Sequence, residues 1–120
     1  MLKVLKKKYL KSSLLTLNLM TSKQIDKTYI LNYLKEHLSE FNNKYSVEQI
    51  GLFGSYARNE ETEDSDIDIY VKMEPSLFNL IDIKEQIEND LNKKVDIIRE
   101  HKNINPIFLK RIKKDLINVE

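Results

Sequence analysis

The chain has 120 residues, of which 41% are hydrophobic, and its 20 basic and 19 acidic residues give a net charge of +1. Such a length and hydrophobic content indicate one folded domain and exclude a globally disordered chain. The sequence has no cysteine and no apolar run near the length of a membrane span, which excludes disulfides, thiolate zinc sites and a transmembrane helix. These features fit a cytoplasmic protein.

Positive charge is concentrated at the start of the chain. Residues 1–19 hold five lysines and no acidic residue, so the remaining residues carry 15 basic and 19 acidic side chains, a charge of −4. A mildly acidic domain argues against direct nucleic-acid binding. The apolar run after these lysines is short and interrupted, and no small-residue cleavage site follows it, which argues against a signal peptide. We expect residues 1–20 to be a disordered extension and residues 21–120 to form the domain.

The first half of the domain alternates between helical and strand patterns. Ser22 is a candidate N-cap for a helix that ends at Asn42-Asn43. Its apolar and aromatic residues recur at helical spacing: Ile25, Tyr29, Ile30, Tyr33, Leu34, His37, Leu38 and Phe41. Residues 47–53 then predict a buried strand, residues 56–61 a short helix, and residues 65–73 a second strand.

The second half continues the alternation. A break at Pro75-Ser76 precedes a helix whose expected apolar residues are Leu77, Leu80, Ile81, Ile87 and Leu91. Residues 94–99 predict a third strand, and Asn105-Pro106 begins the last helix, with Pro at its first position. The expected apolar face of this last helix is Phe108, Leu109, Ile112 and Leu116. The order αβαβαβα predicts an α/β (α+β) domain in which helices pack on one small mixed β-sheet.

Two carboxylates occur together in the second predicted strand. Strand side chains alternate, so Asp66, Asp68 and Tyr70 should share one face while the intervening apolar residues point into a core. Adjacent carboxylates repel each other unless a cation lies between them, and Mg²⁺ is commonly held by one or two carboxylates together with substrate phosphates. The pattern therefore favours a metal-bound nucleotide, the alternative being solvent-facing acids on an edge strand.

Both glycines of the chain, Gly51 and Gly54, lie just before the acidic strand. Glycine permits close backbone approach or an unusual dihedral angle, so Gly54-Ser55 is a candidate phosphate cradle at a helix start. The alternative is an ordinary strand-to-helix turn in which Ser55 caps the helix. The acidic pair that follows favours the phosphate cradle.

The order Gly54-Ser55, then Asp66-x-Asp68, then Asp96 in the third predicted strand resembles the signature of the minimal nucleotidyltransferase (MNT) domains of the DNA polymerase β-like superfamily. The resemblance extends over roughly residues 22–117, and the string Gly-Ser-Tyr-Ala-Arg before Ser-Asp-x-Asp is more specific than Asp-x-Asp alone. One departure is Asn59, where such proteins usually carry glycine, but asparagine tolerates a left-handed backbone better than most residues. The resemblance implies the polymerase β palm-like nucleotidyltransferase fold.

The resemblance also implies roles for individual residues. Asp66, Asp68 and Asp96 would ligate two Mg²⁺ ions, and Asp96 would also act as general base. Gly54 and Ser55 would bind the triphosphate of ATP, the nucleotide substrate. Arg58 would hold the triphosphate or the aspartate pair, the alternative being a surface charge.

The implied function is transfer of AMP from ATP to a hydroxyl of a HEPN-type ribonuclease toxin, and most specifically to a tyrosine hydroxyl. This chain would be the antitoxin of that toxin. Two alternatives remain open. One is a nucleotidyltransferase that acts on a small molecule such as an aminoglycoside, although such enzymes usually carry an extra helical domain. The other is a non-catalytic antitoxin that neutralises its partner by binding alone.

Overall fold

The computed structural model describes residues 24–120, so the prediction for residues 1–20 lies outside the described residues. Four strands, β1 (Val47–Phe53), β2 (Ile67–Met73), β3 (Val95–Arg99) and β4 (Ile117–Asn118), form one sheet in the order β3-β2-β1-β4. β1 is antiparallel to both β2 and β4, whereas β2 and β3 are parallel. The predicted mixed sheet is therefore confirmed.

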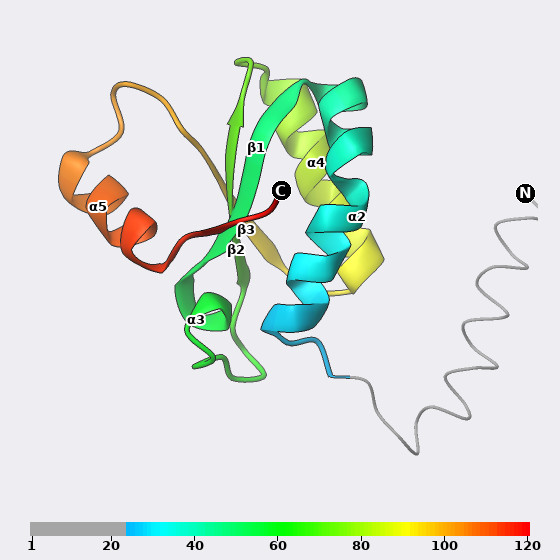
Figure 1. Cartoon of the computed structure of the whole chain (residues 1–120), viewed down its shortest axis with the longest axis vertical. Coiled ribbons are helices and arrows are strands. Elements are labelled where there is room, and N and C mark those ends of the chain that lie inside the picture. Colours follow the sequence, from blue (N-terminus) through cyan, green and yellow to red (C-terminus); the bar gives the residue numbers. More distant parts are fainter. Residues whose placement is uncertain (1–23) are drawn as a thin grey trace, which may run out of the picture.

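Helices cover both faces of this sheet. α2 (Lys27–Tyr45) and α4 (Leu77–Leu91) lie side by side on one face, and α5 (Pro106–Asp115) lies on the other (Figure 1). α4 connects the parallel strands β2 and β3, which is the usual form of a parallel crossover. The short helix α3 (Gly54–Ala57) follows β1 directly.

The residues of β2 alternate between two hydrophobic clusters. Ile67, Ile69 and Val71 are fully buried in the main core under α2 and α4. Tyr70 points to the other face, where it packs with Phe53 of β1 and Ile112 of α5 in a smaller cluster. The smaller cluster fixes α5 over the middle of the sheet and leaves the end of β2 that carries Asp68 next to this helix.

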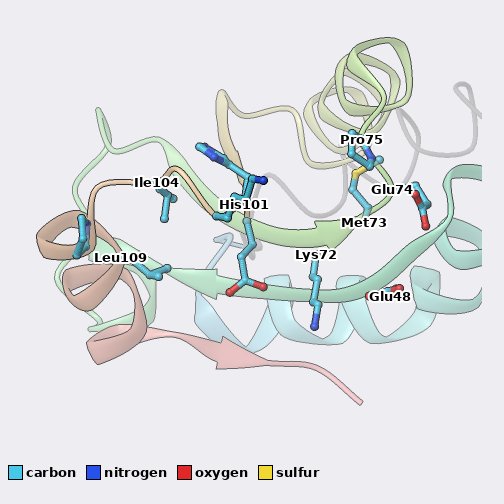
Figure 2. A pocket seen from close by; sticks show the side chains of 11 residues that line it. Glu48, Lys72, Met73, Glu74, Pro75, His101, Ile104 and Leu109 are labelled. Atoms are coloured by element: carbon cyan, nitrogen blue, oxygen red, sulfur yellow. The ribbon is translucent and has the colours of Figure 1, made fainter.

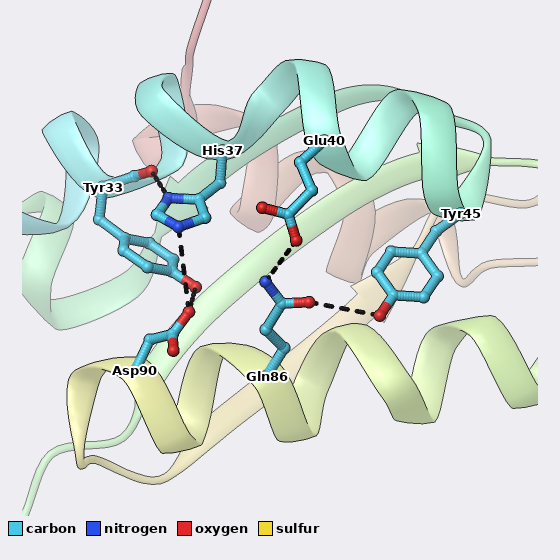
Figure 3. A network of polar contacts seen from close by, with 6 residues as sticks. All are labelled: Tyr33, His37, Glu40, Tyr45, Gln86 and Asp90. Atoms are coloured by element: carbon cyan, nitrogen blue, oxygen red, sulfur yellow. Dashed lines mark hydrogen bonds and ion pairs between the residues drawn. The ribbon is translucent and has the colours of Figure 1, made fainter. Parts of the chain in front are cut away.

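Polar contacts hold α2 against α4 (Figure 3). The Tyr33 hydroxyl donates a hydrogen bond to Asp90 at 2.5 Å, and His37 stacks on the Tyr33 ring with centroids 4.1 Å apart. The amide of Gln86 donates to Glu40 at 2.9 Å. Burial, together with the bond to Asp90, raises the pKa of Tyr33, so the phenol stays protonated as a donor. The two helices thus form one layer on their face of the sheet.

The ends of α2 differ from those expected. Ser22 lies outside the described residues; the helix begins at Lys27, and the Asp26 side chain accepts a hydrogen bond from the Tyr29 amide at 2.9 Å. It continues through Asn42-Asn43 to Tyr45, which is 6% exposed and extends the buried face by another turn. Ser46, with a φ of 59°, ends the helix in the left-handed region.

The turn after β1 also differs. α3 begins at Gly54 and ends at Ala57, earlier than the predicted residues 56–61. The chain leaves the helix at Asn59, which has a φ of 59°. Asparagine therefore adopts the left-handed conformation expected at this position, and the turn survives without glycine.

Three apolar residues assigned to packed faces are exposed instead. In α4 the buried residues are Ile83, Ile87 and Leu91, whereas Leu77 is 68% exposed and Ile81 is 42% exposed. A helix turns about 100° per residue, so Ile81 points away from the face that carries Ile83 and Ile87. In α5 Phe108 is 41% exposed, and Ile112 is the buried residue of this helix.

The final strand was absent from the sequence prediction. β4 pairs with Gly51 and Leu52 of β1. A Cβ atom on Gly51 would lie 2.8 Å from the Ile117 carbonyl oxygen, so this glycine permits the close approach of β4. The two glycines thus serve different purposes, and Gly51 is not part of the turn at Gly54.

Within residues 24–120, none of the helices combines the length and hydrophobicity that crossing a bilayer requires.

Candidate active site

Gly54 brings the start of α3 into contact with the Asp68 carboxylate. A Cβ at position 54 would lie 2.1 Å from Asp68 Oδ2, and the φ of +77° is unfavourable for other residues. Phe53, immediately before this glycine, is the register partner of Asp68 in the antiparallel pair β1–β2. The glycine therefore allows backbone and carboxylate to occupy a space that any side chain would fill.

A second carboxylate lies opposite Asp68 on the neighbouring strand. Asp68 and Asp96 are register partners in the parallel pair β2–β3, so their side chains share one face of the sheet. Asp66 is exposed and lies just before β2, which begins at Ile67 rather than at residue 65. The structure thus brings the three predicted aspartates to one end of the sheet.

The crowding of these carboxylates changes the ionisation of Asp68. Its pKa is raised from 3.8 to about 6, first by partial burial and then by the negative charges of Asp96 and Asp66, whereas Arg58 opposes the shift. A neighbouring cation would relieve this repulsion. A positive charge at the site would therefore stabilise the ionised form of these carboxylates.

A hollow of about 310 Å³ opens beside Asp68 and is lined by residues of β1, α3, β2 and α5. Gly54, Ser55 and Arg58 lie on or next to α3, and α5 supplies the opposite wall. The α5 residues that line it are Phe108, Arg111, Ile112 and Asp115. Arg58 donates hydrogen bonds to Asp115 at 2.6 Å and to Glu60 at 3.0 Å, so it ties α3 to the end of α5.

A larger hollow of about 580 Å³ lies elsewhere, between the ends of β1 and β2 and the segment that leads into α5 (Figure 2). Its lining includes Glu48, Lys72, His101 and Leu109 but none of the three aspartates. Because Asp68, Gly54 and Ser55 line the smaller hollow, and Asp96 is the register partner of Asp68, we place the candidate site there despite its size.

Comparison with known proteins identifies the family. The family model described as Polymerase beta, Nucleotidyltransferase matches residues 32–119. The chain belongs to this nucleotidyltransferase family. The predicted resemblance to the minimal nucleotidyltransferase domains is thereby confirmed.

Relatives of this nucleotidyltransferase carry the name protein adenylyltransferase. The chain is 45% identical over 92 residues to "Putative protein adenylyltransferase MJ0126" of Methanocaldococcus jannaschii, a match that covers 75% of this chain and 94% of that protein. It is 42% identical over 71 residues to "Protein adenylyltransferase MntA" of Thermococcus cleftensis, covering 58% of this chain and 72% of that protein.

Solved structures share the fold. One described as "Structure of putative minimal nucleotidyltransferase" superposes with a TM-score of 0.65 at 26% identity, covering 80% of this chain and 98% of that one. Another, described as "Crystal structure of the toxin-antitoxin with AMP-PNP", has a TM-score of 0.57 at 17% identity and covers 70% of each chain. At that identity the second likeness is one of fold.

The site of this nucleotidyltransferase suits a hard divalent cation. Its candidate ligand atoms are carboxylate oxygens, which Mg²⁺ prefers, and the negative charges of Asp96 and Asp66, after burial, contribute to the raised pKa of Asp68. Within residues 24–120, no group of three or more His, Cys, Asp or Glu side chains is arranged so that it could hold a metal ion by itself. Substrate phosphates commonly complete a Mg²⁺ coordination sphere, so an incomplete protein cage fits this chemistry.

Sequence reasoning missed the contribution of α5. It placed Phe108 on the apolar face of the last helix and assigned no site residue to that helix, yet Phe108 and Arg111 both line the hollow. The spacing of Phe108, Arg111, Ile112 and Asp115 marks one helical face, which is visible in the sequence. Which face turns toward Asp68 depends on the packing of Ile112 against Phe53 and Tyr70. This tertiary contact cannot be read from the sequence.

Proposed function

We propose that this protein is a Mg²⁺-dependent protein adenylyltransferase that moves AMP from ATP to a tyrosine hydroxyl of a HEPN-type ribonuclease toxin. By this modification it acts as the antitoxin of that toxin. The observation that supports the chemistry is the register pairing of Asp68 with Asp96 beside the Gly54 backbone. The protein acceptor is supported by relatives up to 45% identical that are named protein adenylyltransferases. The toxin partner is supported by the MNT resemblance, together with a shared fold solved in a toxin–antitoxin complex.

In this proposal the chain's own residues hold and orient the reactants. Ser55 and the α3 amides bind the triphosphate, and Asp66, Asp68 and Asp96 hold two Mg²⁺ ions. When bound, these ions supply charge neutralisation at the phosphates and a lower pKa for the attacking hydroxyl.

Transfer is an in-line displacement at the α-phosphorus. The bond from the acceptor oxygen to this phosphorus forms while the bond to the β-phosphate oxygen breaks, which releases pyrophosphate. The proton of the acceptor hydroxyl passes to the Asp96 carboxylate. Positioning and charge stabilisation carry the catalysis, with no covalent enzyme intermediate.

The test is transfer of label from ATP, radiolabelled at its α-phosphate, to the HEPN-type protein in the presence of Mg²⁺. Wild type should label the partner, and Asp68→Asn should lose the labelling. Asp82→Asn is the matched control, because Asp82 is an exposed aspartate on α4 at the other face of the sheet. Labelling of the partner by Asp68→Asn at the wild-type rate would contradict the role given to Asp68.

A further inference from the structure

One face of α5 forms a wall of the hollow that also contains Asp68. Phe108, Arg111, Ile112 and Asp115 follow one another at steps of three or one residues along that face, and all four line the hollow with Gly54, Ser55 and Asp68. The nucleotide site therefore has two walls, and only the wall formed by α3 and β2 carries residues of the family signature.

Two contacts fix the orientation of this face. Ile112 is 2% exposed and packs with Phe53 and Tyr70 on the face of the sheet that α5 covers. One turn later, Asp115 accepts the 2.6 Å hydrogen bond from Arg58. Because both anchors lie on the same side of α5, Phe108 and Arg111 are held toward the hollow.

The two arginines of the hollow differ in their partners. The charge of Arg58 is matched by Glu60 and Asp115, which lie 3.0 and 2.6 Å from its nitrogens. Arg111 has neither an ion pair nor a hydrogen-bond partner among residues 24–120. A triphosphate carries several negative charges, and a planar guanidinium can bind phosphate oxygens in a bidentate manner. Arg111 is thus the arginine of the hollow with its full charge available to an anion.

Phe108 supplies an aromatic surface at the same place. Its side chain is 41% exposed although it lines the hollow, and it makes no ring contact with other residues of the described part of the chain. Every nucleobase has a π-face that stacks on aromatic side chains. Phe108 precedes Arg111 by almost one helical turn, so phosphate and base could each meet one of the two side chains.

We propose that α5 is the nucleotide-binding wall of the site, with Arg111 binding the triphosphate of ATP and Phe108 stacking on its base. This inference rests on the proposed function only in that the site takes a nucleoside triphosphate. It is independent of which protein accepts the AMP.

The first test measures the affinity of the purified full chain for ATP with Mg²⁺ by isothermal titration calorimetry, without any partner. Loss of a charge-assisted contact predicts that Arg111→Ala weakens binding roughly 10- to 100-fold. Arg111→Lys should recover part of this loss, because it restores the charge without the planar fork. Lys110→Ala is the matched control: it removes the same charge from the neighbouring exposed position of α5, which does not line the hollow, and should leave affinity unchanged.

The second test separates base from phosphate with inorganic tripolyphosphate as the probe. Phe108→Ala should weaken ATP binding roughly tenfold, as expected for loss of one stacked base, yet leave tripolyphosphate binding as in wild type. Arg111→Ala should weaken both. Phe108→Tyr, which keeps the ring, should bind ATP like wild type.

Equal ATP affinities for Arg111→Ala and Lys110→Ala would overturn the role of Arg111. Unchanged ATP affinity in Phe108→Ala with reduced labelling of the protein acceptor would show that this ring docks the acceptor and would overturn the stacking. If ATP binds as predicted but no protein is labelled, the acceptor part of the proposed function fails and this inference stands. A wild-type protein that binds neither ATP nor tripolyphosphate with Mg²⁺ would overturn both.

Discussion

Replacing Asp68 with asparagine should stabilise the metal-free protein while it removes a residue of the site. Folding moves the pKa of Asp68 from 3.8 to about 6, first through burial and then through the charges of Asp96 and Asp66. The folded state therefore holds this proton more tightly than the unfolded state. The stabilising contribution is complete below about pH 4 and is lost as the pH rises through about 6.

The size of the effect follows from this shift. At about 1.4 kcal/mol per pKa unit, ionised Asp68 destabilises the fold above pH 6 by at most about 3 kcal/mol. Asp68 is only partly buried, so screening by solvent reduces the figure to about 1–2 kcal/mol. A domain of this size gains about 4–8 °C in Tm per kcal/mol, so Asp68→Asn should melt about 4–16 °C above wild type.

The assay is thermal unfolding in the presence of EDTA at about pH 7.5 and again at about pH 4, with Asp82→Asn as the exposed control. The excess Tm of Asp68→Asn should be large at the higher pH and should disappear at the lower one. An Asp68→Asn protein that melts no higher than wild type at the higher pH, or whose excess does not depend on pH, would refute the burial and like-charge crowding inferred for Asp68.

Three further outcomes are expected. Gly54→Ala should lower the free energy of unfolding by at least about 1–2 kcal/mol in urea denaturation, the cost of a left-handed non-glycine residue, and should abolish binding of ATP with Mg²⁺, because its Cβ would displace the Asp68 carboxylate. Gly51→Ala should weaken the pairing of β4 with β1 yet still bind ATP with Mg²⁺. Binding of ATP by Gly54→Ala would contradict the close contact between Gly54 and the Asp68 carboxylate. ATP and Mg²⁺ together should raise the Tm by more than the sum of their separate effects, since each completes the coordination of the other, whereas a strictly additive rise would count against shared ligands. Tyr33→Phe should lose about 1 kcal/mol by urea denaturation through its bond to Asp90 without changing ATP affinity, and an altered affinity would show that the layer of α2 and α4 controls the site.

Elements with strong local signals were predictable from the sequence. β1 was placed correctly at residues 47–53, and Asn105 with Pro106 marked the start of α5, where the Asn105 side chain accepts from the Ile107 amide. The two-residue strand β4 carries no such signal, because it exists through pairing with Gly51 and Leu52, more than sixty residues away. The early start of α3 depends on the positive φ of Gly54, which allows the helix to begin directly at the end of β1.

The site was predictable to the extent that its residues belong to one motif. Alternation along β2 was enough to place Asp68 opposite the buried Ile67 and Ile69. The register of Asp68 with Asp96 could not be predicted, because parallel pairing is set by the crossover through α4 and not by local sequence. The orientation of Phe108 and Arg111 depends likewise on tertiary contacts of Ile112 and Asp115.

The most direct test of the proposed function is intact-mass spectrometry of the HEPN-type protein after co-expression with this chain. The wild-type chain should add whole adenylyl groups to the partner and rescue growth. Asp96→Asn, which keeps the shape of the site but removes the proposed base, should still bind the partner while leaving its mass unchanged and growth rescue weakened. An unmodified partner beside the wild-type chain, with full growth rescue, would contradict the enzymatic account and favour neutralisation by binding alone.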